Sequence, residues 1–333
     1  MFQKRWAMSV PYEFPLGMHA EVAAEMEGLG YTDAWSYEVD GLDAFSVLAI
    51  VAPATKMRVG TAIANVYTRG PATLAQCAAS IGELAPGRFV LGIGSGSQPI
   101  VEQWNNTKFD RPGTRVKEMV QFLRPALAGE RVVFEGKTFQ VDGFRLSRPP
   151  EQPSPIHVAA LREGMLKIAG QVADGVCINW LSAGDVKKSV AVVREAARAA
   201  GRNPDEIEVT ARLMINIDPP GPEKDTTVRR HIAAYLNVPV YREFHEWLGR
   251  SAALSGMWDN WAAGDRRGAL AALPQDTIDE LIVHGSPEER REHVKRYMEA
   301  GVDTAFMSFS TSEKDPVARA KLVHQALKDH APR

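Results

Sequence analysis

A glycine-rich loop at the end of an apolar run is the first part of this sequence that suggests chemistry. Residues 89–96 read FVLGIGSG, so a stretch of strand-forming residues ends abruptly in Gly92, Gly94, Gly96 and small hydroxyl residues. This pattern predicts a buried strand that opens into a loop, where the absence of side-chain bulk lets a ligand approach the backbone N–H groups. A flat or phosphorylated cofactor suits such a loop.

Two common nucleotide sites do not fit this loop. In a dinucleotide-binding fold the glycines follow the first strand of a βαβ unit, and an acidic residue follows about 20 positions later. Here the glycines follow the fourth predicted strand, and no second strand brings an acid into that place. No Gly-Lys-Ser/Thr follows the glycines, which excludes a P-loop.

Two carboxylates are candidates for acid–base chemistry. Glu13 and Glu38 lie at the predicted carboxyl ends of strands, and a carboxyl group with a raised pKa can protonate a reduced substrate. For Glu13, an exposed carboxylate without such a role is an equal alternative. The eight histidines and two cysteines show no metal-ligand spacing, so we predict no metal site.

These candidates are positioned by short apolar strands that alternate with amphipathic helices. We predict strands at residues 5–10, 33–36, 58–63, 89–93, 156–159, 175–178, 207–217 and 304–308. We predict helices at residues 19–29, 43–52, 71–84, 114–128, 164–172, 183–200 and from 286 to 301, with a hairpin at 132–141. Helical crossovers imply parallel pairing, and eight such strands close an α/β (β/α)₈ barrel. A doubly wound open sheet is the structural alternative.

One segment is too long for a single crossover helix. Residues 219–279, between the seventh and eighth strands, contain helical stretches rich in aromatic residues. Burial in a packed core is one explanation for Trp247, Trp258 and Trp261. A second interpretation, compatible with the first, is that the segment forms a lid over the carboxyl-end face of the barrel, where barrel active sites lie. We expect one barrel domain over residues 1–333 with this helical insertion near the active-site face.

Composition restricts the partners. The net charge of −2, with lysines and arginines scattered along the chain, disfavours nucleic acid or an anionic membrane as the main partner. No apolar run approaches the roughly 20 residues of a membrane span, and the first residues lack the apolar core of a signal peptide. We therefore expect a cytoplasmic protein that acts on a small molecule.

Five segments, in the right order and spacing, resemble the luciferase-like family of flavin- and deazaflavin-dependent oxidoreductases. They are AEMEGLGYTDAW, AIAN, LGIGSG, LKIAGQVADGV and GSPEERREHVKRYMEAGVDTAF, and they extend over nearly the whole chain. The segment NVYTRGP is similar to the NPYTRHP of methylene-tetrahydromethanopterin reductases. This favours the branch that uses 8-hydroxy-5-deazaflavin (coenzyme F420) over the branch that uses flavin mononucleotide (FMN). The resemblance also implies a homodimer.

The resemblance implies where the cofactor ring lies. Family members carry a non-prolyl cis peptide bond that supports the middle ring of the cofactor, and the matching bond here is Ala62–Ile63. Such a bond costs about 3–4 kcal/mol and persists only where the fold enforces it. Glu38 and Asn65 match polar contacts near the ring, and Ser95 and Gly96 match the loop that flanks the ring and ribityl chain.

The resemblance also implies a phosphate site after the fifth strand. The matching turn is in ALREGMLKIAG, where free N–H groups and the positive end of a helix dipole suit a phosphate. Its residues are Leu161, Arg162, Gly164 and Met165, with Asn179 at the end of the sixth strand as a further polar contact. Ordinary loop solvation or helix capping is the alternative role for these polar residues.

Two positions depart from the deazaflavin-dependent sugar-phosphate dehydrogenases of this family. Those enzymes carry a histidine after the strand-two acid and a glutamate after the glycine loop, where this chain has Val39 and Ser97. Both departures weaken the case for glucose 6-phosphate as substrate. We predict hydride transfer between coenzyme F420 and a small organic substrate. The rival hypotheses are an FMN-dependent monooxygenase supplied with reduced flavin by a partner reductase, and a catalytically silent F420-binding protein.

Overall fold

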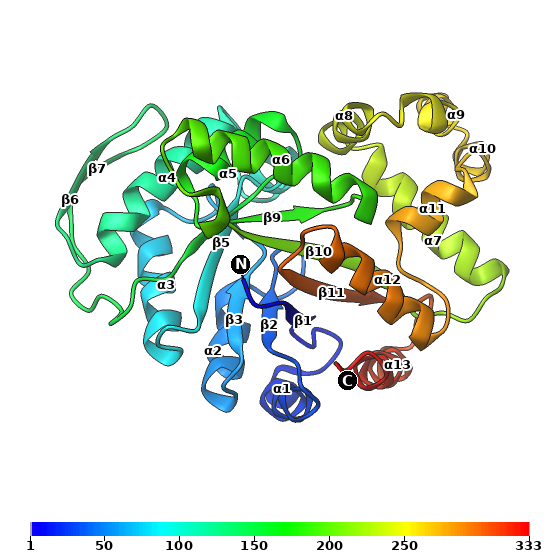
Figure 1. Cartoon of the computed structure of the whole chain (residues 1–333), viewed down its shortest axis with the longest axis horizontal. Coiled ribbons are helices and arrows are strands. Elements are labelled where there is room, and N and C mark those ends of the chain that lie inside the picture. Colours follow the sequence, from blue (N-terminus) through cyan, green and yellow to red (C-terminus); the bar gives the residue numbers. More distant parts are fainter. Residues whose placement is uncertain (1, 333) are drawn as a thin grey trace.

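The computed structural model, which describes residues 2–332 apart from the side chains of residues 223 and 224, is built around a closed barrel of parallel strands (Figure 1). Neighbouring strands follow the order β3-β2-β1-β11-β10-β9-β8-β5, and β5 pairs with β3 to close the ring. This pairing confirms the predicted (β/α)₈ barrel and excludes the open sheet. The barrel strands are β1 (Arg5–Ser9), β2 (Asp33–Ser36), β3 (Arg58–Thr61), β5 (Phe89–Gly94), β8 (Ile156–Ala159), β9 (Gly175–Asn179), β10 (Glu208–Asn216) and β11 (Thr304–Ser310).

Helices cover the outside of the barrel, so the strands are buried on both faces and contain long apolar runs. All six residues of β5 are buried, as its FVLGIG sequence predicts. Capping boxes begin two of the helices, at Ser182 with Asp185 and at Ser286 with Glu289. The outer helices are α1 (His19–Gly28), α2 (Ala44–Ala54), α3 (Pro71–Leu84), α4 (Pro112–Leu127), α5 (Glu163–Val172), α6 (Ala183–Ala199), α12 (Pro287–Glu299) and α13 (Pro316–Asp329).

Several elements of the fold were not predicted from the sequence. The strand predicted at residues 58–63 ends at Thr61, and a two-residue strand, β4 (Ala64–Asn65), pairs with β5 beyond it. The glycine loop runs into a π-helical turn, η2 (Pro99–Trp104), and the chain ends in α13. The remaining short turns are η1 (Leu16–Met18) and η3 (Pro204–Glu206).

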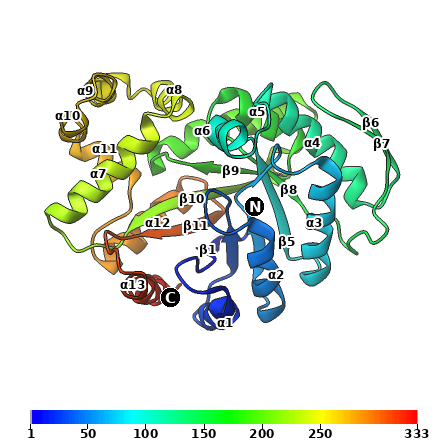
Figure 2. The same ribbon diagram turned by 180° about the vertical axis from the view of Figure 1, so that it is seen from behind.

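A helical insertion lies between β10 and α12, as predicted. Figures 1 and 2 place it at one end of the long axis of the molecule and the hairpin of β6 (Val132–Glu135) and β7 (Gln140–Phe144) at the other. Trp258 lies in a separate apolar cluster that joins the insertion to Trp180 and Met214, beside the carboxyl ends of β9 and β10. The insertion consists of α7 (Pro222–Leu236), α8 (Pro239–Leu248), α9 (Ser251–Ala262), α10 (Arg266–Ala271) and α11 (Gln275–Leu281).

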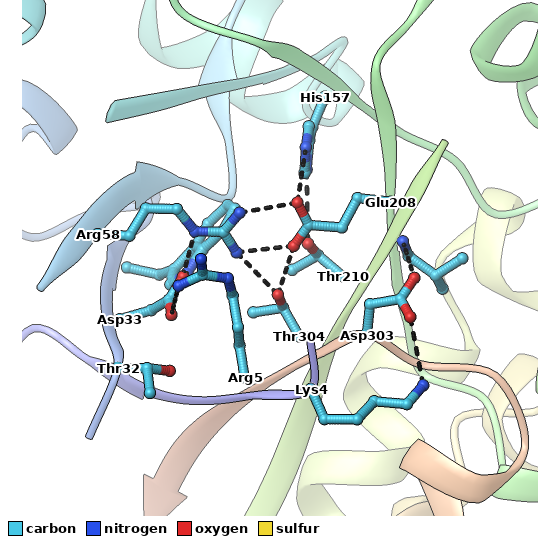
Figure 3. Close-up of polar contacts among 12 residues, drawn as sticks. Lys4, Arg5, Thr32, Asp33, Arg58, His157, Glu208, Thr210, Asp303 and Thr304 are labelled. Atoms are coloured by element: carbon cyan, nitrogen blue, oxygen red, sulfur yellow. Dashed lines mark hydrogen bonds and ion pairs between the residues drawn. The ribbon is translucent and has the colours of Figure 1, made fainter. Parts of the chain in front are cut away.

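A network of buried charges closes the amino-terminal end of the barrel (Figure 3). Asp33, Arg58, Glu208 and Thr304 are each the first residue of a barrel strand, so their side chains meet at that end. The Arg58 guanidinium donates to Oδ1 of Asp33 at 2.5 Å, to both Glu208 carboxylate oxygens at 2.7 Å and to the Thr304 hydroxyl at 2.8 Å. Burial by itself would raise the pKa of Glu208, but the Arg58 contacts and the nearby His157 lower it to about 2. Every carboxylate in this group has a positive partner, as buried charges require.

Candidate functional site

The carboxyl ends of the strands bring several of the predicted cofactor residues together. Asn65 pairs with Gly94 in the ladder between β4 and β5. Gly96 has φ of +64°, and a Cβ added there would lie 2.2 Å from the Asn65 amide nitrogen. Asn65 and Gly96 are therefore in contact, and only glycine fits at position 96 without moving its neighbour.

The peptide bond between Ala62 and Ile63 is cis, which confirms the prediction. Both residues pack against the cluster of Trp35, Val90 and Cys177 in the barrel interior. They therefore form part of the interior wall just beyond β3, on the same side of the barrel as Asn65 and Gly96.

Gly92 is required by the packing of the barrel strands, whether or not a ligand binds at the loop. A Cβ on Gly92 would lie 1.8 Å from the Thr61 carbonyl oxygen, and the Thr61 hydroxyl donates to the Gly92 carbonyl at 2.7 Å. Close packing of β5 against β3 thus demands glycine at position 92. The sequence alone did not distinguish this requirement from the space needed by a ligand at the loop.

Glu38 is held by contacts that order the rim of the barrel. Its carboxylate pairs with Arg69 at 2.5 Å and accepts from the backbone N–H groups of Ala44 at 3.1 Å and Asn65 at 3.4 Å. These contacts connect the end of β2 to the residue that touches Gly96. They suit a positioning role for Glu38.

Glu13, the other candidate acid, lies half-buried in the segment after β1. Burial raises the pKa of its carboxyl group, and its own backbone N–H and the charge of Arg319 offset part of that rise. Burial raises the pKa of the Tyr37 hydroxyl, and the nearby Glu13 carboxyl group adds to that rise. A carboxyl group that keeps its proton to higher pH near the barrel mouth matches what a general acid needs.

The predicted phosphate turn is the amino terminus of α5, which follows directly after β8. The first N–H groups of a helix have no partner within the helix, and no side chain caps them at Arg162. A Cβ on Gly164 would meet nothing within 4 Å, so space is open beside these donors, while Leu161 and Met165 pack against the core. Arg162 itself forms an ion pair with Glu243 of the insertion through one terminal nitrogen.

An interior arginine and a set of aromatic rings form the part of the barrel mouth that the sequence analysis missed. The Arg212 guanidinium lies 4.0 Å from the centre of the Tyr37 ring and donates to the Ser308 hydroxyl at 3.0 Å. The Tyr12 hydroxyl donates to the Tyr37 carbonyl and accepts from the Tyr37 N–H, both at 2.8 Å. Tyr12 and Tyr37 are thereby fixed to each other beside Arg212.

Trp180 and the insertion supply the remaining rings. Trp180, which follows β9, lies 4.4 Å from Tyr235 and 5.2 Å from His231 between ring centres. Tyr241 of α8 lies 5.4 Å from Tyr235, and its hydroxyl contacts the side chain of Asn179. The insertion therefore places aromatic side chains directly beside the carboxyl end of β9.

A signal for Arg212 was present in the sequence. In β10, Glu208, Thr210 and Arg212 alternate with the apolar Val209 and Ala211. Period-two alternation in a strand that is covered by helices places the polar set inside the barrel.

Two further features concern the part of the chain that the structure describes: metal ligands and membrane-spanning helices. No group of three or more histidine, cysteine, aspartate and glutamate side chains is arranged there to hold a metal ion. None of its helices has both the length and the apolar character needed to cross a bilayer.

Comparisons with known proteins agree with this architecture. Residues 1–304 match the family model described as luciferase-like monooxygenase. The chain is 28% identical over 287 residues to the 5,10-methylenetetrahydromethanopterin reductase of Methanolobus tindarius, with 85% of this chain and 87% of the relative covered. It is 30% identical over 223 residues to the F420-dependent glucose-6-phosphate dehydrogenase of Kineococcus radiotolerans, with 62% and 66% covered. The solved coenzyme F420-dependent tetrahydromethanopterin reductase of Methanopyrus kandleri has the same fold, with a TM-score of 0.77 at 22% identity over 99% of this chain and all of that chain.

Proposed function

From the premise that the chain belongs to the luciferase-like monooxygenase family, we propose that it is an oxidoreductase that uses coenzyme F420 to transfer a hydride to or from a small organic substrate. The name of the Kineococcus radiotolerans relative states dependence on F420. The observation that carries the proposal is the open, uncapped amino terminus of α5. This helix follows β8, and β8 pairs with β5. The glycine loop after β5 contacts Asn65.

The residues present fit such a cofactor. The N–H groups at Gly164 and Met165, in the uncapped first turn of α5, would hold its phosphate. Asn65, Gly96 and the Ala62–Ile63 segment would contact its ring. When bound, the deazaflavin supplies the hydride chemistry, while the protein orients the substrate and controls access of water.

The chain's own groups would then handle the proton that accompanies the hydride. Glu13 has the raised pKa that a proton donor needs, and it lies near Tyr37 at the mouth. Glu38, engaged by Arg69 and by two N–H groups, would position Asn65. Val39 and Ser97, in place of the histidine and glutamate of sugar-phosphate dehydrogenases, argue for a substrate other than glucose 6-phosphate.

The proposal is tested by titrating the purified protein with coenzyme F420 and, separately, with FMN, following the absorbance and fluorescence of each cofactor. Saturable F420 binding with weak or absent FMN binding is expected. Tight FMN binding without F420 binding would instead favour the rival monooxygenase, which uses reduced flavin and oxygen.

A second measurement addresses the silent-protein alternative. The F420-loaded protein is incubated with a panel of small alcohols, aldehydes, acids and enones, and the deazaflavin absorbance band is followed in both directions. Turnover with any member supports an enzyme, whereas a saturable F420 site without turnover across the panel supports the binding protein. Homodimerisation, which the family resemblance implies, stays a prediction and is checked by light scattering.

A further inference from the structure

Arg58 and Arg212 both point into the barrel, and they differ in whether a carboxylate of the protein balances their charge. Arg58, at the amino-terminal end, lies between Asp33 and Glu208, so two carboxylates balance its charge (Figure 3). Arg212, towards the carboxyl end, has no carboxylate within ion-pair distance in the part of the chain that the structure describes. Arg212 is half-buried, and a guanidinium that is partly removed from water is stabilised by a hydrogen-bond acceptor or a counter-charge.

The donors of Arg212 are only partly used. One terminal nitrogen donates to the Ser308 hydroxyl at 3.0 Å, while the buried Nε has no hydrogen-bond acceptor. The guanidinium plane is fixed between rings, with its carbon 4.0 Å from the centre of Tyr37 and 5.9 Å from that of Phe306. The guanidinium is thus held in one orientation, and its terminal nitrogens carry more N–H groups than Ser308 accepts, which suits recognition of a planar oxyanion.

Aromatic rings and the ring of His231 lie near this guanidinium. Burial, reinforced by the charge of Arg212, lowers the pKa of His231 to about 4, so its ring is neutral near pH 7. Trp180 and Tyr235 lie with their ring centres 4.4 Å apart beside it. Flat apolar groups pack well against such rings.

We propose that Arg212 binds the anionic group of the substrate, and that the substrate is a small carboxylic acid with a flat, apolar body. The carboxylate would take terminal N–H groups of Arg212 that Ser308 leaves free, and the body would lie against the half-buried rings of Tyr37 and Tyr235. This inference rests on the proposed function only in calling the ligand a substrate, because the anion site itself is formed by the chain alone.

The test uses a matched pair of probes, 4-fluorobenzoate and the neutral 4-fluorobenzamide, titrated into the full chain and followed by fluorine NMR. Wild-type protein is expected to bind the acid about tenfold or more tightly than the amide. In Arg212→Met, binding of the acid is expected to fall to the level of the amide, whereas Arg212→Lys keeps part of the preference.

The control variant is Arg242→Met. Arg242 also lies over a tryptophan, 4.7 Å from the ring centre of Trp258, but it is paired with Glu246 on the exposed side of α8. Its removal is expected to leave the preference for the acid unchanged. Equal binding of acid and amide by the wild type, binding of neither, or equal acid binding by the wild type and Arg212→Met would each overturn the inference. The wild-type comparison stands even if the Arg212 variants do not fold.

Coenzyme F420 is titrated into the same samples. F420 binding without discrimination between acid and amide would refute the anion site and leave the proposed function intact. Acid-selective binding that depends on Arg212, in a protein that does not bind F420, would refute the proposed function and leave the anion site standing.

Discussion

The location of the cofactor phosphate can be tested by placing one negative charge at the amino terminus of α5. Gly164 is the second residue of that helix, is exposed, and has open space where a side chain would begin. Gly184 occupies the same position in α6, is also exposed, and a Cβ there would make an ordinary contact of 3.5 Å with Ser182. Gly164→Asp and Gly184→Asp are therefore the same change at equivalent positions of neighbouring helices.

The expected effect follows from electrostatics. A carboxylate about 5 Å from a singly charged phosphate repels it by about 1 kcal/mol at the dielectric constant of water and by about 3 kcal/mol at an effective value of about 20. F420 binding to Gly164→Asp should therefore weaken by roughly 5- to 150-fold. An acidic residue at a helix amino terminus is itself favourable by about 0.3–1 kcal/mol, so neither variant should lose stability.

The assay is an F420 fluorescence titration of both variants and the wild type, with melting temperatures measured on the same samples. We expect only Gly164→Asp to bind F420 more weakly than the wild type. The difference in affinity between that variant and the wild type should shrink as the salt concentration is raised. Equal weakening by both variants would point to a general charge effect. Wild-type affinity in Gly164→Asp would refute the assignment of the phosphate to this turn.

Three further predictions concern the stability of the scaffold. Glu208→Gln leaves Arg58 partly uncompensated and should lower the free energy of unfolding by about 3–5 kcal/mol in urea, whereas the exposed Glu83→Gln should change it by less than about 1 kcal/mol. The folded-state pKa of Glu208, about 2, lies below its ordinary value of 4.5, so its contribution is complete above pH 4.5 and is lost as pH falls towards 2. Melting temperatures across that range should therefore fall more steeply for wild type than for Glu208→Gln. Gly96→Ala should lower the free energy of unfolding by about 1–3 kcal/mol and should weaken F420 binding. Gly201 also has a positive φ, +72°, but has open space around it, so Gly201→Ala should lower the free energy of unfolding without changing F420 binding.

Features with a local signal were predictable from the sequence, and features that depend on distant strands were not. The strands, most helices and the bounds of α3 followed from apolar periodicity and from proline or serine start signals. Gly96 and Asn65 could be assigned to one site because each belongs to a motif of the family. By contrast, Arg58 and Glu208 are 150 residues apart, and each resembles an ordinary charged residue at the start of a strand. Only closure of the barrel brings them together.

The same physical rule accounts for both interior arginines and explains why they differ. A guanidinium that is partly removed from water among aromatic rings is stabilised when a carboxylate of the protein or of a ligand balances its charge. At the amino-terminal end the fold supplies that balance itself, through Asp33 and Glu208, and the result is stability. At the carboxyl end no such carboxylate reaches Arg212 in the described part of the chain, and its Nε lacks an acceptor. A carboxylate added there by Ser308→Asp would supply the missing charge. This variant should have a higher melting temperature and should not bind 4-fluorobenzoate, because the new carboxylate would occupy the anion site. Undiminished binding would show that the probe does not occupy the space beside Arg212.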